Sequence, residues 1–417
     1  MNEELMIIHN FIRTRWFSNF SSKKALRKHQ QKLFNKQLAF IKQNSMFYKE
    51  KDNLPIIDKK IFMDKFNDIN TVGIDKDQAM KFAIECEKTR EFTKKLNGVT
   101  VGLSSGTSGH RGIFLVSDRE RAMWAGTVLA KLLPKWHLFG VRVAFFMRAN
   151  SELYETIQSS IIKFKFFDML KDMDDNLSEL QEFQPTLLVA PPSCLLTIAH
   201  WNNAQQIKPK KVISIAEVLE DVDAEVIKSE LNVDIIHQVY QCTEGFLGTT
   251  CEYGTLHINE DVIQIEKEQL DEKRFIPIIT DLKRRSQPII RYRLNDVLVE
   301  KKEPCKCGSP FLALEKIEGR QDDVFEFEND NGKVYIFPDF IRRCILFAED
   351  VGEYKVQQIS NHEVTVLADD LNEKSKQQII SEFKKLAENY KIPVPTITFK
   401  PYEFDSTKKM KRVEKLC

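Results

Sequence analysis

Apolar residues recur along the chain with two spacings, and these spacings predict where helices and strands lie. Between Glu3 and Lys49 they return every three or four positions among Lys, Arg and Gln, which is typical of amphipathic helices. We therefore expect a helical cap over about residues 1–50, packed on the rest of the protein, with membrane or partner binding as the alternative. Asp118 to Leu133 shows the same spacing after Ser117, a preferred N-cap residue, and also predicts a helix.

Strand and helix patterns alternate through the middle of the chain. Val141 to Met147 is a continuous apolar run that predicts a buried strand. Further segments of the two kinds follow: Glu152 to Ile162, Thr186 to Ala190, Pro192 to His200, Lys211 to Ile215, Ala224 to Leu231 and Asp234 to Tyr240. This alternation predicts βαβ units and a mostly parallel sheet, so a ligand is expected beyond the carboxyl ends of its strands.

Two further patterns follow after Tyr253. Short strand-like runs separated by turn residues come first: Leu256 to Ile265, Phe275 to Asp281, Ile289 to Arg293 and Val297 to Glu300. From Asp322 onward strands are predicted near Tyr354 to Ile359, Glu363 to Leu367 and Thr396 to Phe399, with a helix from Ser375 to Glu388. The expected fold class is therefore α/β. We predict an N-terminal domain of residues 1–319, with a small β subdomain at about 254–319, and a C-terminal α+β domain of residues 320–417.

The charge balance excludes some classes of partner. Lys and Arg number 62 and Asp and Glu number 61, so the net charge of +1 gives no reason to expect binding to nucleic acid or to an anionic membrane. Two basic runs, Lys283 to Arg285 and Lys408 to Arg412, are expected to be solvated faces. No apolar run of about 18 residues occurs, and residues 1–12 lack the apolar core of a signal peptide, so we expect a cytoplasmic protein.

The segment from Val101 to Gly112 carries the first candidate chemistry. It reads Val-Gly-Leu-Ser-Ser-Gly-Thr-Ser-Gly-His-Arg-Gly, an apolar run that becomes a loop rich in glycine and hydroxyl groups. Glycines let successive backbone N–H groups converge on an anion, and hydroxyls add donors, so the loop can hold phosphate. It matches neither G-x-x-x-x-G-K-[ST] nor G-x-G-x-x-G. Taken alone, an ordinary flexible turn is an equally good interpretation.

Further motifs follow in a fixed order. They are Ser214 to Glu217, Tyr240 to Gly245, Pro288 to Asp296 followed by Gly319 to Asp323, and Thr407 to Arg412. With the loop, they make the sequence resemble the adenylate-forming superfamily of acyl- and aryl-CoA synthetases, most closely its phenylacetate-CoA ligase-like branch. The resemblance runs from about Phe47 to the C-terminus. It implies a C-terminal domain that is mobile, with Asp322 at the hinge, and it makes a homodimer an expectation by analogy.

The resemblance implies a role for each matching residue in binding ATP and Mg²⁺. The phosphate loop that would hold the β- and γ-phosphates comprises Ser104, Ser105, Gly106, Thr107, Ser108 and Gly109. Arg111 stands where the family often has lysine. Ala216 and Glu217 match the turn against which adenine lies. Tyr240, Thr243 and Glu244 match a motif whose hydroxyl touches the α-phosphate and whose carboxylate helps to hold Mg²⁺.

Three more residues complete the implied site. Asp296 matches the acid that accepts the ribose hydroxyls, and Arg320 matches a nearby ribose and phosphate contact. Lys409 matches the mobile catalytic lysine that meets the acyl-phosphate region. Lys408 occupies the place of the family's glycine, so either lysine could be the catalytic one, and we assign Lys409.

Four residues suggest a metal site. Cys251 and His257, with the turn Cys305-Lys306-Cys307-Gly308, supply enough soft or borderline ligands for a closed tetrahedral zinc site. Similar positions look like a structural zinc knuckle in the phenylacetate-CoA ligase-like branch. Reduced thiols beside a surface histidine are the alternative. The other cysteines, at positions 86, 194, 242, 344 and 417, have no such spacing.

Together these features predict an ATP-dependent enzyme that activates a carboxylic acid as its acyl-AMP. The resemblance implies an aromatic acid and transfer to a thiol such as coenzyme A. Phe145, Phe146 and Tyr154 either line an apolar pocket for that acid or belong to the core. Two alternatives stay open: an adenylyltransferase that places AMP on a phenolic hydroxyl, and a nucleotide-binding protein without catalysis.

Overall fold

The structure is a computed structural model, and it divides into two compact units. It describes residues 3–89, 91–104, 112–134, 140–147, 162–169, 171–329, 332–346, 348, 351–369, 371–403 and 411–417. The first unit comprises Met1–Leu294 and Val299–Lys316, and the second comprises Asn295–Leu298 and Ile317–Cys417. Both units combine helices with sheets, so the predicted α/β class is confirmed.

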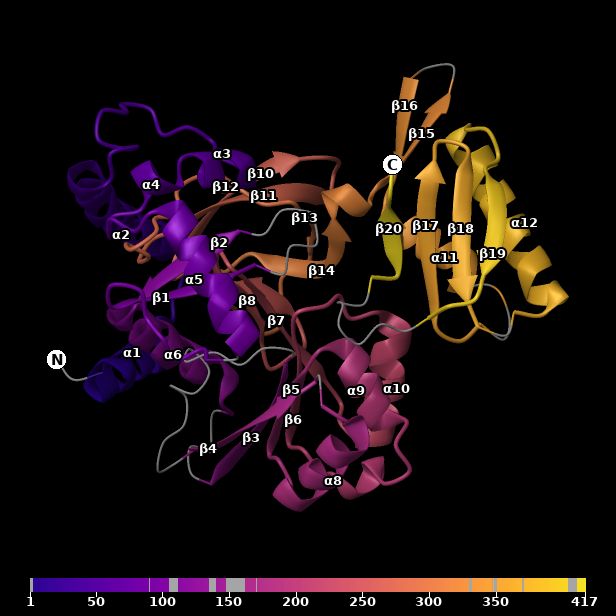
Figure 1. Cartoon of the computed structure of the whole chain (residues 1–417), viewed down its shortest axis with the longest axis horizontal. Coiled ribbons are helices and arrows are strands. Elements are labelled where there is room, and N and C mark those ends of the chain that lie inside the picture. Colours follow the sequence, from indigo (N-terminus) through magenta and orange to yellow (C-terminus); the bar gives the residue numbers. More distant parts are fainter. Residues whose placement is uncertain are drawn as a thin grey trace. The chain divides into compact units, whose positions relative to one another are not determined.

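A parallel sheet forms one part of the first unit (Figure 1). Its strands, in spatial order, are β4 (Ile162–Asp168), β3 (Val141–Met147), β5 (Leu187–Ala190), β6 (Lys211–Ser214) and β7 (Ile236–Cys242). Among the described residues, three helices and a short 3₁₀ turn lie in the connections: α8 (Met173–Phe183), α9 (Pro192–Ala199), η1 (Ala204–Gln206) and α10 (Asp221–Leu231). The core between these helices and the sheet is apolar, and Phe146 stacks on Phe167 at 4.5 Å within it. The predicted alternation of strands and helices is thus confirmed from Thr186 to Tyr240, whereas the predicted segment Glu152 to Ile162 lies outside the described residues except for Ile162, and β4 and α8 were not predicted.

Antiparallel strands continue the sheet from β7. They are β8 (Gly245–Thr250), β9 (Leu256–Ile258) and β14 (Ala313–Arg320), with β10 (Ile263–Gln269), β11 (Arg274–Asp281) and β12 (Tyr292–Arg293) beyond them. Gly248 allows β8 and β9 to approach closely, because a Cβ there would lie 2.9 Å from the carbonyl oxygen of His257. Strand β13 (Asp296–Glu300) and β14 carry the chain between the two units.

Helices make up much of the N-terminal part of the first unit, and α1 (Glu3–Phe17) and α2 (Lys23–Asn44) lie within residues 1–50, where the sequence predicts amphipathic helices. They are followed by α3 (Lys59–Asp64), α4 (Phe66–Ile69) and α5 (Lys76–Thr89), then by the hairpin β1 (Val99–Leu103) and β2 (Ile113–Ser117) and by α6 (Asp118–Leu132). Ser117 caps α6 in a capping box with Glu120, which explains why this helix begins where the sequence predicts. Helix α1 packs on α6 at Gly126, where a Cβ would lie 2.4 Å from the Ile7 carbonyl oxygen. Arg15 of α1 also donates to the Ala130, Leu133 and Pro134 carbonyls at the end of α6.

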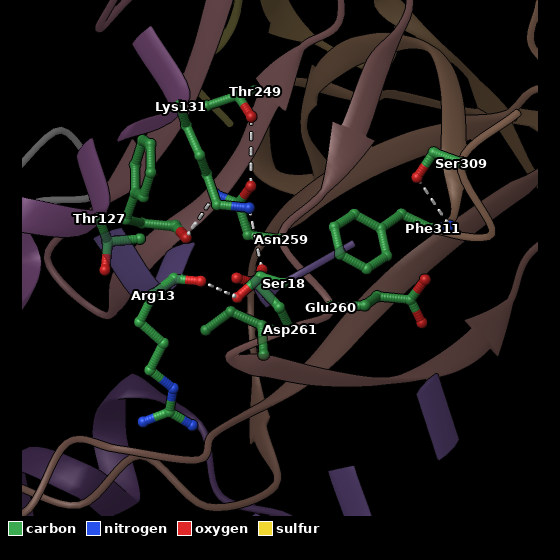
Figure 2. Close-up of polar contacts among 12 residues, drawn as sticks. Arg13, Ser18, Thr127, Lys131, Thr249, Asn259, Glu260, Asp261, Ser309 and Phe311 are labelled. Carbon is green, nitrogen blue, oxygen red and sulfur yellow. Dashed lines mark hydrogen bonds and ion pairs between the residues drawn. The ribbon is translucent and has the colours of Figure 1, made fainter. Parts of the chain in front are cut away.

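A buried polar cluster joins α6 to the antiparallel strands (Figure 2). Lys131 of α6 lies 3.0 Å from the carboxylate of Asp261, and both side chains are almost entirely buried. The Lys131 ammonium also lies 5.3 Å from the centre of the Phe311 ring, which contributes a cation–π contact. Asn259 accepts a hydrogen bond from Thr249 and donates to the Phe246 carbonyl at 3.0 Å, so the segment that carries Asp261 is itself fixed. The cluster therefore positions α6.

The second unit has its own sheet and core. Its strands lie in the order β19 (Thr396–Lys400), β18 (Glu363–Ala368), β17 (Tyr354–Ser360) and β20 (Val413–Lys415), and the remaining elements are η2 (Gln321–Asp323), the pair β15 (Phe325–Asn329) and β16 (Gly332–Ile336), α11 (Pro338–Leu346) and α12 (Glu373–Tyr390). The two helices pack on this sheet over one apolar core (Figure 1). Across the described residues of both units, a membrane-spanning helix is absent, since none combines the required length with sufficient hydropathy.

Candidate active site

The candidate site begins at the carboxyl ends of two neighbouring parallel strands. Ser214 at the end of β6 pairs with Ala190 of β5 on one side and with Gln238 of β7 on the other. The turn at Ala216 follows β6, and the turn at Thr243 and Glu244 follows β7. Ligands of parallel sheets bind at this edge, so the two predicted motifs leave the sheet where a ligand is expected.

Ala216 lies in a backbone conformation that L residues rarely adopt. Its φ is +66°, and the Glu217 N–H donates to the Ile215 carbonyl across it at 2.8 Å. A residue with a Cβ in this region costs about 1–3 kcal/mol and persists only where the surroundings impose it. Such strain is typical of binding sites.

The side chain of Glu217 has a partner on a neighbouring helix. Its carboxylate accepts hydrogen bonds from the backbone N–H of Ser193, at 3.2 Å, and from the Ser193 hydroxyl, at 2.7 Å. Ser193 lies in the first turn of α9, where backbone N–H groups lack intrahelical acceptors. Glu217 thus ties the Ala216 turn to α9.

Several contacts fix the turn that carries Glu244. The Thr243 hydroxyl donates to the Glu244 carboxylate at 2.9 Å, and Arg284 donates to the Thr243 carbonyl at 2.6 Å. Burial, followed by the charge of the neighbouring Glu244 carboxylate, raises the pKa of Tyr292, so its hydroxyl stays protonated beside Glu244. The register of β7 and β8 shifts between Tyr240 and Gln241, and such bulges redirect the residues that follow. The carboxylate is therefore oriented before any ligand binds.

The β1–β2 hairpin holds the ends of the predicted phosphate loop together. Ser104 donates its N–H to the Gly112 carbonyl at 2.8 Å, and Gly112 donates its N–H to the Ser104 hydroxyl oxygen at 2.6 Å. The rest of the predicted loop, Ser105, Gly106, Thr107, Ser108, Gly109 and Arg111, lies outside the described residues. Of this loop, the structure therefore places only the two ends.

The remaining predicted ligands of the nucleotide belong to the second unit. Asp296 opens β13 and Arg320 ends β14. Asn295, next to Asp296, donates to the Asp322 carboxylate and accepts from the Gln321 N–H at 2.7 Å. The structure thus links the segment of the predicted ribose ligand to the predicted hinge residue.

The C-terminal basic run is not simply a solvated face. Lys408 and Lys409 lie outside the described residues. Lys411, two positions further on, pairs with the buried Asp323 at 2.8 Å. Arg412 is 8% exposed, and its guanidinium lies 4.9 Å from the centre of the Tyr354 ring.

The other basic run, Lys283 to Arg285, is also turned inward, so the prediction of a solvated face was wrong. Burial lowers the pKa of Lys283. Arg284 binds the Thr243 carbonyl, and the Arg285 guanidinium lies 4.4 Å from the centre of the Phe40 ring. The reason is local: the Asp281 carboxylate accepts the backbone N–H groups of Lys283 and Arg284, and this turn directs the basic side chains into the protein.

The four predicted metal ligands come together in the first unit. Their ligand atoms all lie within 4.8 Å of one another. The Cys251 and Cys305 sulfurs are 3.7 Å apart, and the Cys307 sulfur lies 3.4 Å from His257 Nε2. Tetrahedral zinc with bonds of about 2.3 Å separates two sulfurs by about 3.8 Å, so the spacing fits. His257 Nδ1 lies 3.2 Å from the Phe311 carbonyl, and a proton donated there leaves Nε2 available to a metal.

The fold of the chain matches solved structures. No protein-family model matches the sequence, and no curated protein does. A 2-hydroxyisobutyryl-CoA ligase in its postadenylation state, in complex with R3-HIB-AMP, is similar with a TM-score of 0.61 at 13% identity, over 97% of this chain and 88% of that one. The amide bond synthetase McbA from Marinactinospora thermotolerans has a TM-score of 0.54 at 11% identity, over 73% of this chain and 65% of that one. The anthranilate CoA ligase AuaEII, in complex with anthranoyl-AMP, has a TM-score of 0.50 at 13% identity, over 75% and 66%. The chain has the adenylate-forming ligase fold.

The phenylalanine pair Phe145 and Phe146, which the sequence placed either in a substrate pocket or in the core, can now be located in this fold. Phe146 is fully buried and stacks on Phe167, and Phe145 packs among apolar strand residues with Phe164 and Phe166. Of the two interpretations of this pair, the structure supports a core position for Phe146. Tyr154 lies outside the described residues.

The sequence did not reveal the residues that support Glu244 and Glu217 in this adenylate-forming ligase fold. Tyr292 was part of a recognised motif, but nothing in its spacing showed that it lies close enough to Glu244 for that carboxylate to raise its pKa. Arg284 looked like one residue of a charge run, and Ser193 like an ordinary residue after two prolines. Pro192 followed by Ser193 at a predicted helix start could have indicated where α9 begins, and so where backbone N–H groups without intrahelical acceptors lie, but not that Glu217 binds them.

Proposed function

We propose that this protein is an adenylate-forming enzyme that activates a carboxylic acid with ATP. The observation that carries the proposal is the pair of preformed turns at adjacent strand ends, with the strained Ala216 in one and the oriented Glu244 carboxylate in the other. The fold adds support, because structures with the same fold have been determined with R3-HIB-AMP and anthranoyl-AMP bound. Site geometry and fold thus point to the same chemistry.

The proposed reaction needs little covalent help from the protein. A carboxylate oxygen attacks the α-phosphorus of ATP, and the bond to pyrophosphate breaks as the acyl-AMP forms. Glu244 would hold Mg²⁺, a hard cation that prefers carboxylate and phosphate oxygens, and Lys409 would offset the charge that develops. Asp296 would accept the ribose hydroxyls, and Arg320 would contact ribose and phosphate. Positioning and charge supply the catalysis.

We further propose an aromatic acid as the substrate and a thiol, such as coenzyme A, as the acceptor. The support is the motif resemblance to the phenylacetate-CoA ligase-like branch. Similar structures bear on the acceptor as well: one 2-hydroxyisobutyryl-CoA ligase structure contains 2-HIB-AMP and CoA. The amide bond synthetase is named for a different bond, so the acceptor must be tested separately from the acid.

Exchange of labelled pyrophosphate into ATP tests the proposal. Purified protein with Mg²⁺ and a panel of aryl and aliphatic acids should exchange label only when its acid is present, and Glu244→Gln should lower this rate by about 10²-fold or more. Exchange that depends on a phenol instead would indicate an adenylyltransferase. Tight ATP binding with no exchange for any acid or phenol would indicate a binding protein, and the proposal would then be wrong.

We also propose that Cys251, His257, Cys305 and Cys307 hold one structural zinc ion. Their spacing and the hydrogen bond from His257 to a backbone carbonyl support it. Four protein ligands complete a tetrahedron and leave no position for a substrate, so the metal would stabilise the fold and take no part in the reaction.

A further inference from the structure

The segment from Asp281 to Gln287 connects two parts of the candidate site that are far apart in the sequence. It begins at Asp281, the last residue of β11, and its side chains reach the Thr243–Glu244 turn on one side and strand β2 on the other. The resemblance assigned no role to this segment. Its contacts nevertheless give it one.

Arg284 makes the link to the turn that carries Glu244. One guanidinium nitrogen, Nη1, donates to the Thr243 carbonyl at 2.6 Å, and Nη2 donates to the side-chain oxygen of Gln287 at 2.8 Å. The third nitrogen, Nε, is buried and has no partner among the described residues. A planar guanidinium that spans two acceptors in this way fixes their separation, which a lysine ammonium does not do.

Gln287 extends the link to the hairpin of the phosphate loop. Its oxygen accepts the Leu115 N–H at 3.1 Å, and its nitrogen donates to the Ile113 carbonyl at 3.0 Å. The side-chain amide therefore pairs with β2 as a neighbouring strand would. Gln287 is only 1% exposed, so water cannot replace these bonds.

We propose that Arg284 is a positioning residue that holds Glu244 in register with the root of the phosphate loop. The chain of contacts runs from β2 through Gln287 and Arg284 to Thr243, whose hydroxyl donates to Glu244. In this role Arg284 acts through Thr243 and Glu244. This inference rests on the proposed function, because it assigns Arg284 to the reaction in which Glu244 holds Mg²⁺.

The test compares Arg284→Lys with Arg274→Lys as a matched control. Arg274 lies at the other end of β11, where it pairs with Asp271 at 3.0 Å. In Arg284→Lys the maximal rate of acid-dependent exchange should fall about 10–100-fold, the usual effect of losing a residue that orients a metal ligand. The Mg²⁺ concentration for half-maximal rate should rise, which loss of folded protein alone would not cause. Arg274→Lys should match the wild type in both quantities.

Chemical rescue adds a second measurement. Arg284→Ala leaves a space of guanidinium shape, so added guanidinium ion at non-denaturing concentration should restore part of the lost rate. If Arg284→Lys does not fold, Gln287→Glu takes its place: it keeps the acceptor for Arg284 and removes the donor to Ile113, and it should show the same rise in Mg²⁺ requirement.

The outcomes separate this inference from the proposed function. The inference alone would be overturned if the wild type shows acid-dependent exchange and Arg284→Lys has the same exchange rate and the same Mg²⁺ requirement. It would also be overturned if the exchange rate of Arg284→Lys falls only in parallel with its folded fraction. If the wild-type protein shows no pyrophosphate exchange with any of the acids tested, the proposed function is wrong. In that case the Mg²⁺ dependence of ATP binding still tests the inference. A higher Mg²⁺ concentration for half-maximal ATP binding in Arg284→Lys than in the wild type supports the inference, and an equal concentration refutes it.

Discussion

At the scale of single residues, His237 shows how burial makes stability depend on pH. It lies in β7, and burial, together with the charge of nearby Lys211, lowers its pKa from 6.5 to about 4. Its Nδ1 is buried and has no hydrogen-bond partner among the described residues. The folded protein therefore holds this histidine neutral, whereas the unfolded chain protonates it below about pH 6.5.

This difference predicts acid destabilisation of the first unit. Because the folded pKa lies below the unfolded one, the unfolded state binds more protons between about pH 6.5 and 4, and the free energy of unfolding falls as pH falls through that window. From pH 7 to 5 we expect a loss of about 2 kcal/mol from His237, which His237→Gln should remove. Urea unfolding followed by tryptophan fluorescence measures it, since all four tryptophans lie within residues 1–294. His362→Gln changes an exposed histidine and should keep the wild-type pH dependence. If the free energy of unfolding changes with pH equally in the wild type and in His237→Gln, the assignment to His237 is wrong.

The sequence could name candidate site residues but could not predict their conformations. The resemblance to the adenylate-forming superfamily pointed to Ala216, Glu217 and Glu244, because their motifs are visible in the chain. The sequence could not show that Ala216 has a positive φ, since an alanine carries no signal for that conformation as glycine does. Nor could it show that Glu217 caps α9, because that bond depends on how β6 and α9 pack.

At the scale of elements, the zinc site should stabilise the region where β9 and β14 meet. Cys251 precedes β9, His257 lies in it, and Cys305 and Cys307 precede β14. Zinc bound by these four residues would join the two segments. Because the unfolded chain has no such site, the free energy of zinc binding would add to the free energy of folding. We expect about one zinc ion per chain by elemental analysis of protein purified without chelator. Cys307→Ser should lower the zinc content and the midpoint of thermal unfolding.

The matched control for this prediction is Cys417→Ser, which changes an exposed cysteine at the end of the chain and should leave zinc content and midpoint unchanged. Folded protein depleted of zinc should still exchange pyrophosphate, since the metal has no catalytic position. A preparation without zinc that is as stable as a zinc-supplemented one would show that these residues are reduced thiols.

Element boundaries were predictable where one local signal set them. The helix after Ser117 and the strand from Val141 to Met147 were predicted almost to the residue, because a capping box and a buried apolar run define them. The strand expected over Ile289 to Arg293 is much shorter, and within this segment only Tyr292–Arg293 forms a strand. The reason is Arg291, which has a φ of +46° and binds Glu266 and the Leu54 carbonyl. These contacts are distant in sequence and leave no local pattern.

At the scale of the whole molecule, the proposed reaction draws on both units. Glu244 belongs to the first unit, and the candidate catalytic lysine belongs to the second. The fold class followed from the alternation of strands and helices, whereas the domain boundary predicted at residue 319 stays a prediction. A sequence cannot reveal whether a second unit takes part in catalysis, because that depends on how side chains from both meet one ligand.

Lys409 and Lys408 provide the means to test that participation. An ammonium that offsets charge developing on the α-phosphate acts mainly in the transition state, so Lys409→Ala should lower acid-dependent exchange by about 10²–10³-fold. Its ATP affinity and thermal unfolding should match the wild type, because an interaction made only in the transition state does not contribute to ground-state binding. Lys408→Ala is the matched control and should exchange at nearly the wild-type rate. The reverse result would transfer the role to Lys408, and full activity in both variants, and in the double variant, would show that the second unit does not supply the catalytic cation.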